Sequence, residues 1–134
     1  MPDMVEILLW VALGSAIGGM ARFFILGVVA RAFGEAFPWG TLTVNVTGSF
    51  AIGALFVAAQ AGGPVDRPEV VALALTSVLG SYTTVSSFSL QTLGLARDGR
   101  WLRAGANVVL SLGLCLAAAA AGVLAAMAVV GGAP

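Results

Sequence analysis

The sequence predicts an all-α integral membrane protein with four transmembrane helices that form a single membrane domain over residues 1–134. Of the 134 residues, 60% are hydrophobic and only 9% are charged, and the mean hydropathy is +1.04. A soluble domain usually carries about 25% charged residues, which cover its surface. The few charges here fall mainly between four long apolar runs, and this distribution indicates a membrane protein.

Each apolar run is long enough to cross a bilayer, which takes about 20 mostly apolar residues. The predicted spans are residues 7–30, 39–60, 70–96 and 101–131. The first contains one charge, Arg22, and the second and third contain none. Trp39 and Trp101 open the second and fourth spans, where amphipathic rings favour the membrane interface.

The charges also predict an orientation. Four spans place both termini on the same side of the membrane. The first and third linkers carry four arginines, Arg31, Arg97, Arg100 and Arg103, whereas the opposite side carries only Arg67. Because cytoplasmic loops are enriched in Lys and Arg, we expect these two linkers to face the cytoplasm. The N-terminus is acidic rather than basic, which argues against a cleaved signal peptide.

The composition excludes several kinds of function. The sequence has no His and one Cys, so disulfide frameworks, zinc sites and His-based catalysis are not expected, and Cys115 is interpreted as a packing residue. We expect no enzymatic activity. A net charge of zero without a basic block gives no reason to expect nucleic acid as a partner. The spans hold no acidic residue except Glu69 at one edge, which argues against proton-driven transport but not against a passive pore.

The middle of the third span is unusually polar. Residues 80–89 read GSYTTVSSFS, in which seven of ten residues carry a hydroxyl. The apolar stretches before and after are too short to cross the bilayer alone, so this segment falls near the midplane. A broken helix there would have to bury its free backbone groups or line a polar cavity, where helix ends bind ions. A continuous helix whose hydroxyls bond to backbone carbonyls is the alternative, and composition alone favours neither.

Polar residues recur at helical spacing in two other spans. Thr41, Asn45 and Ser49 are four residues apart and share one helical face. Asn107 and Ser111 have the same spacing in the fourth span. The two rows favour a polar track through the membrane, and hydrogen bonding between helices is the alternative.

The first span has two further features. We expect Arg22 to extend its charge to the nearer interface, with anchoring of a polar cluster at a pore mouth as the alternative. The GSAIG segment, Gly14 to Gly18, places small residues four apart, which suits close helix packing or dimerisation. Four short helices do not easily enclose a selective pore, so we expect an oligomer.

Four segments follow one another in an order and spacing that carry a resemblance. They are GGMAR (residues 18–22), PWGTLTVNVTGSFAIG (38–53), GSYTTVSSFS (80–89) and NVVLS (107–111). Over nearly its whole length the chain resembles the CrcB/Fluc family of fluoride channels. The resemblance implies a fluoride-selective passive ion channel that exports cytoplasmic fluoride, in the inner or plasma membrane of a prokaryotic cell.

The resemblance also implies an assembly. The family forms antiparallel dual-topology dimers with two pores, each lined by both subunits. The third helix is broken near the midplane, and backbone carbonyls at the break hold a structural sodium ion at the dimer centre. By position these are the carbonyls of Gly80 and Thr83. Hard oxygen ligands suit such a cation.

The family's pattern assigns the fluoride pore to particular residues. By position these are Asn45, Ser86, Ser87 and Phe88, with Val85 at the place of a second Phe. The polar rows described above add Thr41, Asn107 and Ser111 to the expected pore. The electropositive edge of a Phe ring can coordinate an anion without a formal charge, and weak ligands let the ion leave. The chain departs from the family at Val85, where a second Phe is usual, and at Gln91, where Glu is usual.

The expected partners are therefore fluoride, the lipid bilayer and a second copy of the chain. An alternative is a subunit that conducts only with a similar but different chain, which the arginine bias and Val85 support. A small multidrug-type exporter is a further alternative. That class carries a membrane carboxylate in the first span, and residues 7–30 contain none.

Overall fold

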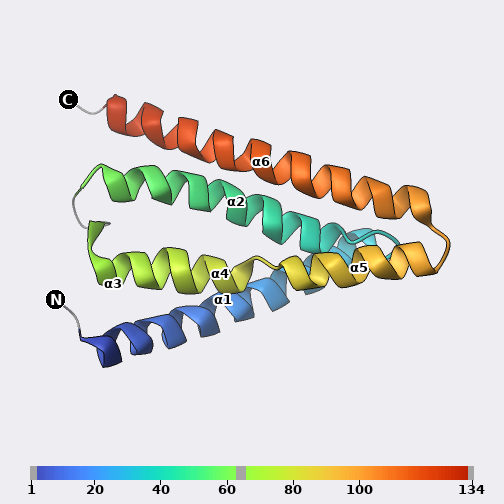
Figure 1. Ribbon diagram of the computed structural model, residues 1–134, viewed down its shortest axis with the longest axis horizontal. Coiled ribbons are helices and arrows are strands. Elements are labelled where there is room, and N and C mark those ends of the chain that lie inside the picture. The colour runs from blue at the N-terminus through green and yellow to red at the C-terminus, as the bar shows by residue number, and fades with distance from the viewer. Residues whose placement is uncertain (1–2, 63–65, 133–134) are drawn as a thin grey trace.

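The computed structural model describes residues 3–62 and 66–132, and within these ranges all regular structure is helical. Three helices are continuous: α1 (Met4–Phe33), α2 (Trp39–Gln60) and α6 (Trp101–Gly131). The third span, Pro68–Arg97, is assembled from shorter pieces. All four segments are long and apolar enough to cross a membrane, which confirms the predicted spans (Figure 1).

The third span is a broken helix, and the alternative of a continuous helix is wrong. It consists of α3 (Pro68–Val71), η2 (Ala72–Leu79), α4 (Gly80–Tyr82) and α5 (Val85–Arg97). Thr83 and Thr84 lie between α4 and α5 in extended conformations, with φ/ψ of −80°/160° and −154°/121°. The Thr83 N–H still bonds to the Leu79 carbonyl at 3.0 Å, but the Thr84 N–H makes no helical hydrogen bond. Figure 1 shows the gap between the two helical halves.

The η2 segment is a π-helix, which the sequence did not predict. Its Ser77 side chain is almost completely buried. The Ser77 hydroxyl lies 2.9 Å from the Ala72 carbonyl and 2.6 Å from the Leu73 carbonyl, so it bonds within its own helix. Such wide turns are uncommon and often occur near functional sites.

The helices pack in two contacting groups. Helix α2 lies along α6, and α1 lies against η2 and α4 (Figure 1). Both ends of the described chain lie at the same end of the molecule as the last turn of α2 and the start of α3 (Figure 1), and the connections from α1 to α2 and from α5 to α6 lie at the opposite end. This arrangement confirms that an even number of spans brings the termini to one side.

Glycines allow the helix backbones to come close in both groups. A Cβ atom at Gly14 would overlap the Ser77 side chain, and one at Gly18 would overlap the Val78 carbonyl oxygen. Between α2 and α6, a Cβ atom at Gly53 would overlap the Ala119 carbonyl oxygen. The GSAIG segment therefore serves packing within the chain, the first of the two roles that its spacing predicted.

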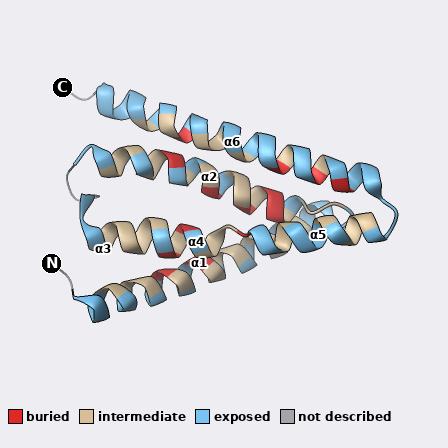
Figure 2. Cartoon of the chain, in the orientation of Figure 1, coloured by how far each residue is buried: buried red, intermediate tan, exposed pale blue. Residues whose placement is uncertain are grey.

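The outer faces of the helices are exposed, as the pale blue in Figure 2 shows, and many of the exposed side chains are large and apolar. The buried apolar side chains are few: Leu42, Val44, Leu79 and Ala104. The buried polar ones are Thr41, Ser77, Thr84, Asn107 and Ser111. Large apolar side chains such as Phe23 and Leu102 point outward, where lipid tails solvate them as well as a protein core would.

The close approach of α1 to η2 gives a direct test of this packing. We expect Gly18→Ala to lower the free energy of unfolding by about 1–3 kcal/mol, because the added methyl overlaps a backbone oxygen that cannot move freely. Gly19→Ala is the matched control, since its Cβ would meet nothing within 4 Å. Thermal unfolding in detergent measures both, and equal melting temperatures would contradict the observed packing.

Candidate functional site

The break in the third span is held by the side chain of Asn45 on α2. The Thr84 N–H donates to Asn45 Oδ1 at 2.7 Å, and Asn45 Nδ2 donates to the Thr84 carbonyl at 2.8 Å. In a continuous helix the Thr84 N–H would instead bond to the Gly80 carbonyl. One side-chain amide therefore satisfies both backbone groups of the residue at the break.

Arg22 on α1 contacts Thr83, the residue before Thr84 at the break. Its Nη1 donates to the Thr83 carbonyl at 3.3 Å. The expectation that Arg22 extends to the interface is therefore wrong, and the alternative of an anchored polar cluster is closer to the observed structure. The reason is that the break offers a carbonyl freed from helical pairing, which is a better partner than a distant headgroup.

Thr84 also starts the second half of the span. Its hydroxyl accepts from the Ser87 N–H at 3.2 Å, as an N-cap residue does. The same oxygen lies 3.2 Å from the Ser86 and Ser87 hydroxyls. The predicted pore residues Ser86 and Ser87 thus share one hydroxyl cluster at the first turn of α5.

A groove of about 420 Å³ lies beside the break, where α2, α5 and α6 meet. It brings together five of the predicted site residues: Asn45, Thr83, Val85, Phe88 and Ser111. Its lining contains no charged side chain among the described residues. Cys115 also lines this groove, one helical turn beyond Ser111.

A row of hydrogen bonds connects the groove with the other half of α5. Ser111 Oγ lies 3.4 Å from Asn107 Oδ1, and Asn107 Nδ2 donates to Thr92 Oγ1 at 2.8 Å. Asn107 is almost fully buried at 1% exposure. Thr92 was not predicted as a site residue. The signal available for it was indirect: a buried amide in a membrane helix needs a polar partner on a neighbouring helix.

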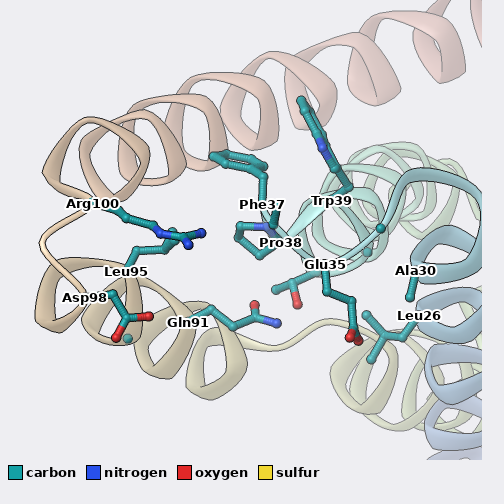
Figure 3. A pocket seen from close by; sticks show the side chains of 15 residues that line it. Leu26, Ala30, Glu35, Phe37, Pro38, Trp39, Gln91, Leu95, Asp98 and Arg100 are labelled. Atoms are coloured by element: carbon teal, nitrogen blue, oxygen red, sulfur yellow. The ribbon is translucent and has the colours of Figure 1, made fainter.

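Thr41 lies apart from the groove, in a second cavity. This cavity of about 380 Å³ is formed by residues 34–41 with the last turns of α1, the end of α5 and the turn before α6 (Figure 3). The side chains of Gln91 and Arg100 extend into it. Thr41 is 3% exposed, and its hydroxyl has no hydrogen-bond partner among the described residues. Helical spacing correctly joins Thr41 to the face of Asn45, but the two residues line different spaces.

The predicted sodium ligands lie on α4 and at the break. Gly80 is exposed, and a Cβ atom there would meet nothing within 4 Å. The carbonyl of Gly80 loses its helical partner to Asn45, and the carbonyl of Thr83 faces Arg22. Free carbonyls at the end of a helix suit a hard cation. The described residues contain no cluster of His, Cys, Asp or Glu that would suit another metal.

The fold and the site define a small multi-pass membrane protein with a broken helix and a neutral polar groove at mid-span. The chain belongs to the CrcB-like family: the model described as "CrcB-like protein, Camphor Resistance (CrcB)" matches residues 9–123. It is 58% identical over 127 residues to "Fluoride-specific ion channel FluC 2" of Rhodopseudomonas palustris (strain BisB18), covering 94% of this chain and 97% of the relative. It is 52% identical over 127 residues to "Fluoride-specific ion channel FluC" of Opitutus terrae, covering 92% and 94%.

The unpaired hydroxyl of Thr41 gives a prediction on stability. Thr41→Val replaces a buried hydroxyl by a methyl of similar size, and we expect the free energy of unfolding to rise by about 1 kcal/mol. Thr43→Val is the control, because the Thr43 hydroxyl donates to the Trp39 carbonyl at 2.8 Å and its loss gives no such gain. Thermal unfolding of both variants decides the point. A clear loss of stability in Thr41→Val would show that its hydroxyl is satisfied by a bound molecule.

Proposed function

We propose that this chain forms a fluoride-selective channel through which cytoplasmic fluoride leaves passively. The observation that carries the proposal is the groove at the helix break, which offers hydroxyl, amide and aromatic groups but no charged side chain. A fixed charge would hold a small anion too tightly for conduction, whereas several weak ligands let it enter and leave. The names of the relatives point to the same ion.

The path follows the polar residues from one cavity to the other. The first cavity holds the free hydroxyl of Thr41, and the groove holds the ring of Phe88. The hydrogen-bonded row of Thr92, Asn107 and Ser111 lies between helices α5 and α6 and ends at the groove. An anion that moves past this row meets neutral donors in place of its hydration water.

Passive transport fits the lining of the groove, which holds no carboxylate among the described residues, whereas Glu35 and Asp98 line only the first cavity. No catalytic step is proposed. A negative-inside membrane potential drives an anion outward, by about 2.3 kcal/mol per 100 mV for one charge. The multidrug-type exporter remains disfavoured, since residues 7–30 hold no carboxylate.

The assembly that completes the pore is an antiparallel dimer of two copies, with a structural sodium ion at its centre. The carbonyls of Gly80 and Thr83 would hold the ion, and its charge would join the breaks of the two subunits. The donors fit, because both oxygens are neutral and hard. The Thr83 carbonyl has two lone pairs, so a bond from Arg22 leaves one for a cation.

A substitution at Gly80 can test the proposed dimer contact without disturbing the fold of one subunit. Within the chain a side chain at this position meets open space, and its φ of −62° is allowed for any residue. We therefore expect Gly80→Val to leave the helices intact while it weakens dimerisation at least about tenfold, by excluding the partner. Circular dichroism and the monomer–dimer equilibrium in detergent measure the two effects. A variant that dimerises like the wild type would contradict the proposed contact.

A heteromeric channel is the second candidate, and two observations favour it. The end of the molecule with the first and third connections carries Arg31, Arg97, Arg100 and Arg103, which favours one fixed orientation. Val85 is exposed beside the groove without the ring that the resemblance leads one to expect, so a partner chain would have to supply it.

The deciding experiment is fluoride efflux from liposomes that contain this chain alone. We expect rapid release of fluoride, followed by a fluoride electrode with a potassium ionophore present, and no comparable release of chloride. Phe88→Leu should slow fluoride release about tenfold, because an apolar side chain of similar size lacks the electropositive ring edge. Phe56→Leu is the matched control, since Phe56 lies exposed on α2 and lines neither cavity.

The same assay distinguishes the two candidates. No fluoride release from folded wild-type protein would contradict a self-sufficient channel and favour the heteromer, which release after addition of a related chain would establish. Equal release of fluoride and chloride would contradict fluoride selectivity in either case.

A further inference from the structure

Asn45 makes a contact that differs from an ordinary side-chain hydrogen bond. Its amide forms two bonds to a single residue, accepting from the Thr84 N–H at 2.7 Å and donating to the Thr84 carbonyl at 2.8 Å. The two partners are 39 residues apart in sequence and belong to different spans, Asn45 on α2 and Thr84 at the break in the third span. The Asn45 amide and the Thr84 backbone therefore form a closed ring through two hydrogen bonds.

The backbone conformation of Thr84 explains why this ring forms. With φ of −154° and ψ of 121°, the residue is extended. In an extended strand the N–H and C=O of one residue point to the same side, and a residue of an adjacent antiparallel strand exchanges both bonds with it. The Asn45 amide has one donor and one acceptor side by side, so it takes the place of that missing neighbour.

The membrane makes this replacement necessary. At mid-span no water is available to satisfy a free N–H or C=O, and each unsatisfied group costs several kcal/mol. The Thr84 N–H has lost its helical partner, the Gly80 carbonyl, and Asn45 Oδ1 accepts from it instead. An Asp at position 45 offers no donor when ionised, and an Ala offers neither group.

The ring also positions the groove. Thr84 is the N-cap of α5, and its hydroxyl binds the Ser87 N–H and the Ser86 hydroxyl. Phe88 follows one residue later, on the turn that this cap starts. Fixing the Thr84 backbone therefore fixes the direction in which α5 begins and the position of its first side chains.

We propose that Asn45 is a positioning residue that closes the helix break by imitating a neighbouring β-strand, and that it acts on the ion path through Thr84 and α5. Of the two amide hydrogens, one is committed to the Thr84 carbonyl, which leaves a single N–H for the groove. Only the transport readout of this inference rests on the proposed function; the structural readout does not.

The first experiment measures amide hydrogen exchange in the segment that contains Thr84, on the full-length protein in detergent. We expect Asn45→Ala to speed exchange there at least about tenfold, because two hydrogen bonds are lost. Thr43→Val is the control on the same helix, and its hydroxyl bonds only to its own helix at Trp39. Unchanged protection in Asn45→Ala would overturn the inference.

The second experiment uses Asn45→Asp and pH, since a protonated carboxyl again offers one donor and one acceptor. We expect its melting temperature to fall below that of the wild type at neutral pH and to recover on acidification, while Asn45→Ala does not recover. The other titratable or charged groups near the break or the groove are Arg22 on α1, Tyr82 on α4 and Cys115 on α6. All three are unchanged in the Thr43→Val control, so a recovery confined to Asn45→Asp belongs to the introduced carboxyl.

Fluoride efflux then separates this inference from the proposed function. If Asn45→Ala stops efflux while exchange at Thr84 stays slow, Asn45 is an ion ligand alone and the inference is wrong. If the wild type releases no fluoride but Asn45→Ala exposes Thr84 to exchange, the inference holds and the proposed function fails. A pH response of Asn45→Asp that equals that of Asn45→Ala would also overturn the inference.

Discussion

The two hydrogen bonds between the Asn45 amide and the Thr84 backbone are the contact on which the rest of the structure depends. A helix can be interrupted inside a bilayer only where the freed backbone groups find other partners. Here the partner comes from α2, and Arg22 of α1 binds the neighbouring carbonyl of Thr83. The break is therefore a junction of three spans. The close packing of α1 on η2 through Gly14 and Gly18 brings Arg22 within reach of it.

Hydroxyl composition overstates the number of groups that are free to bind an anion. Thr43, Ser49, Ser89 and Thr92 each donate to the carbonyl four residues earlier, so their hydrogens are spent within their own helices. An anion requires donors, and these side chains could serve it only by giving up a bond. The remaining donors include the hydroxyl of Thr41, which has no partner among the described residues, and the second amide hydrogens of Asn45 and Asn107. They also include the hydroxyl of Ser87, whose oxygen accepts from Thr84 Oγ1.

Hydropathy predicted the four spans because each depends on length and composition alone, and glycine spacing predicted close packing. Composition alone did not decide between a broken and a continuous third helix, and only the family resemblance favoured the break. The contact that stabilises it joins Asn45 to Thr84 across 39 residues, and no local pattern encodes such a pair. The partner of Asn107 at Thr92, on a neighbouring helix, escaped prediction for the same reason. The π-helical turns around Ser77 are local, and no pattern in the sequence predicted them. The dimer, the sodium ion and the pore roles of individual residues stay predictions.

The break in the third helix accounts for both ions of the proposed function, the conducted fluoride and the structural sodium. At the break, α4 ends and presents carbonyls, and α5 begins and presents N–H groups. The negative end of one helix dipole and the positive end of the next thus lie at the same depth. The first end suits a cation, held by the carbonyls of Gly80 and Thr83, and the second suits an anion near Ser86, Ser87 and Phe88. Because Arg22 adds positive charge on the carbonyl side, a sodium ion there needs oxygens from a second subunit to be bound firmly. In the proposed assembly the cation site and the dimer therefore depend on each other, and we expect a chain that cannot dimerise to lose both.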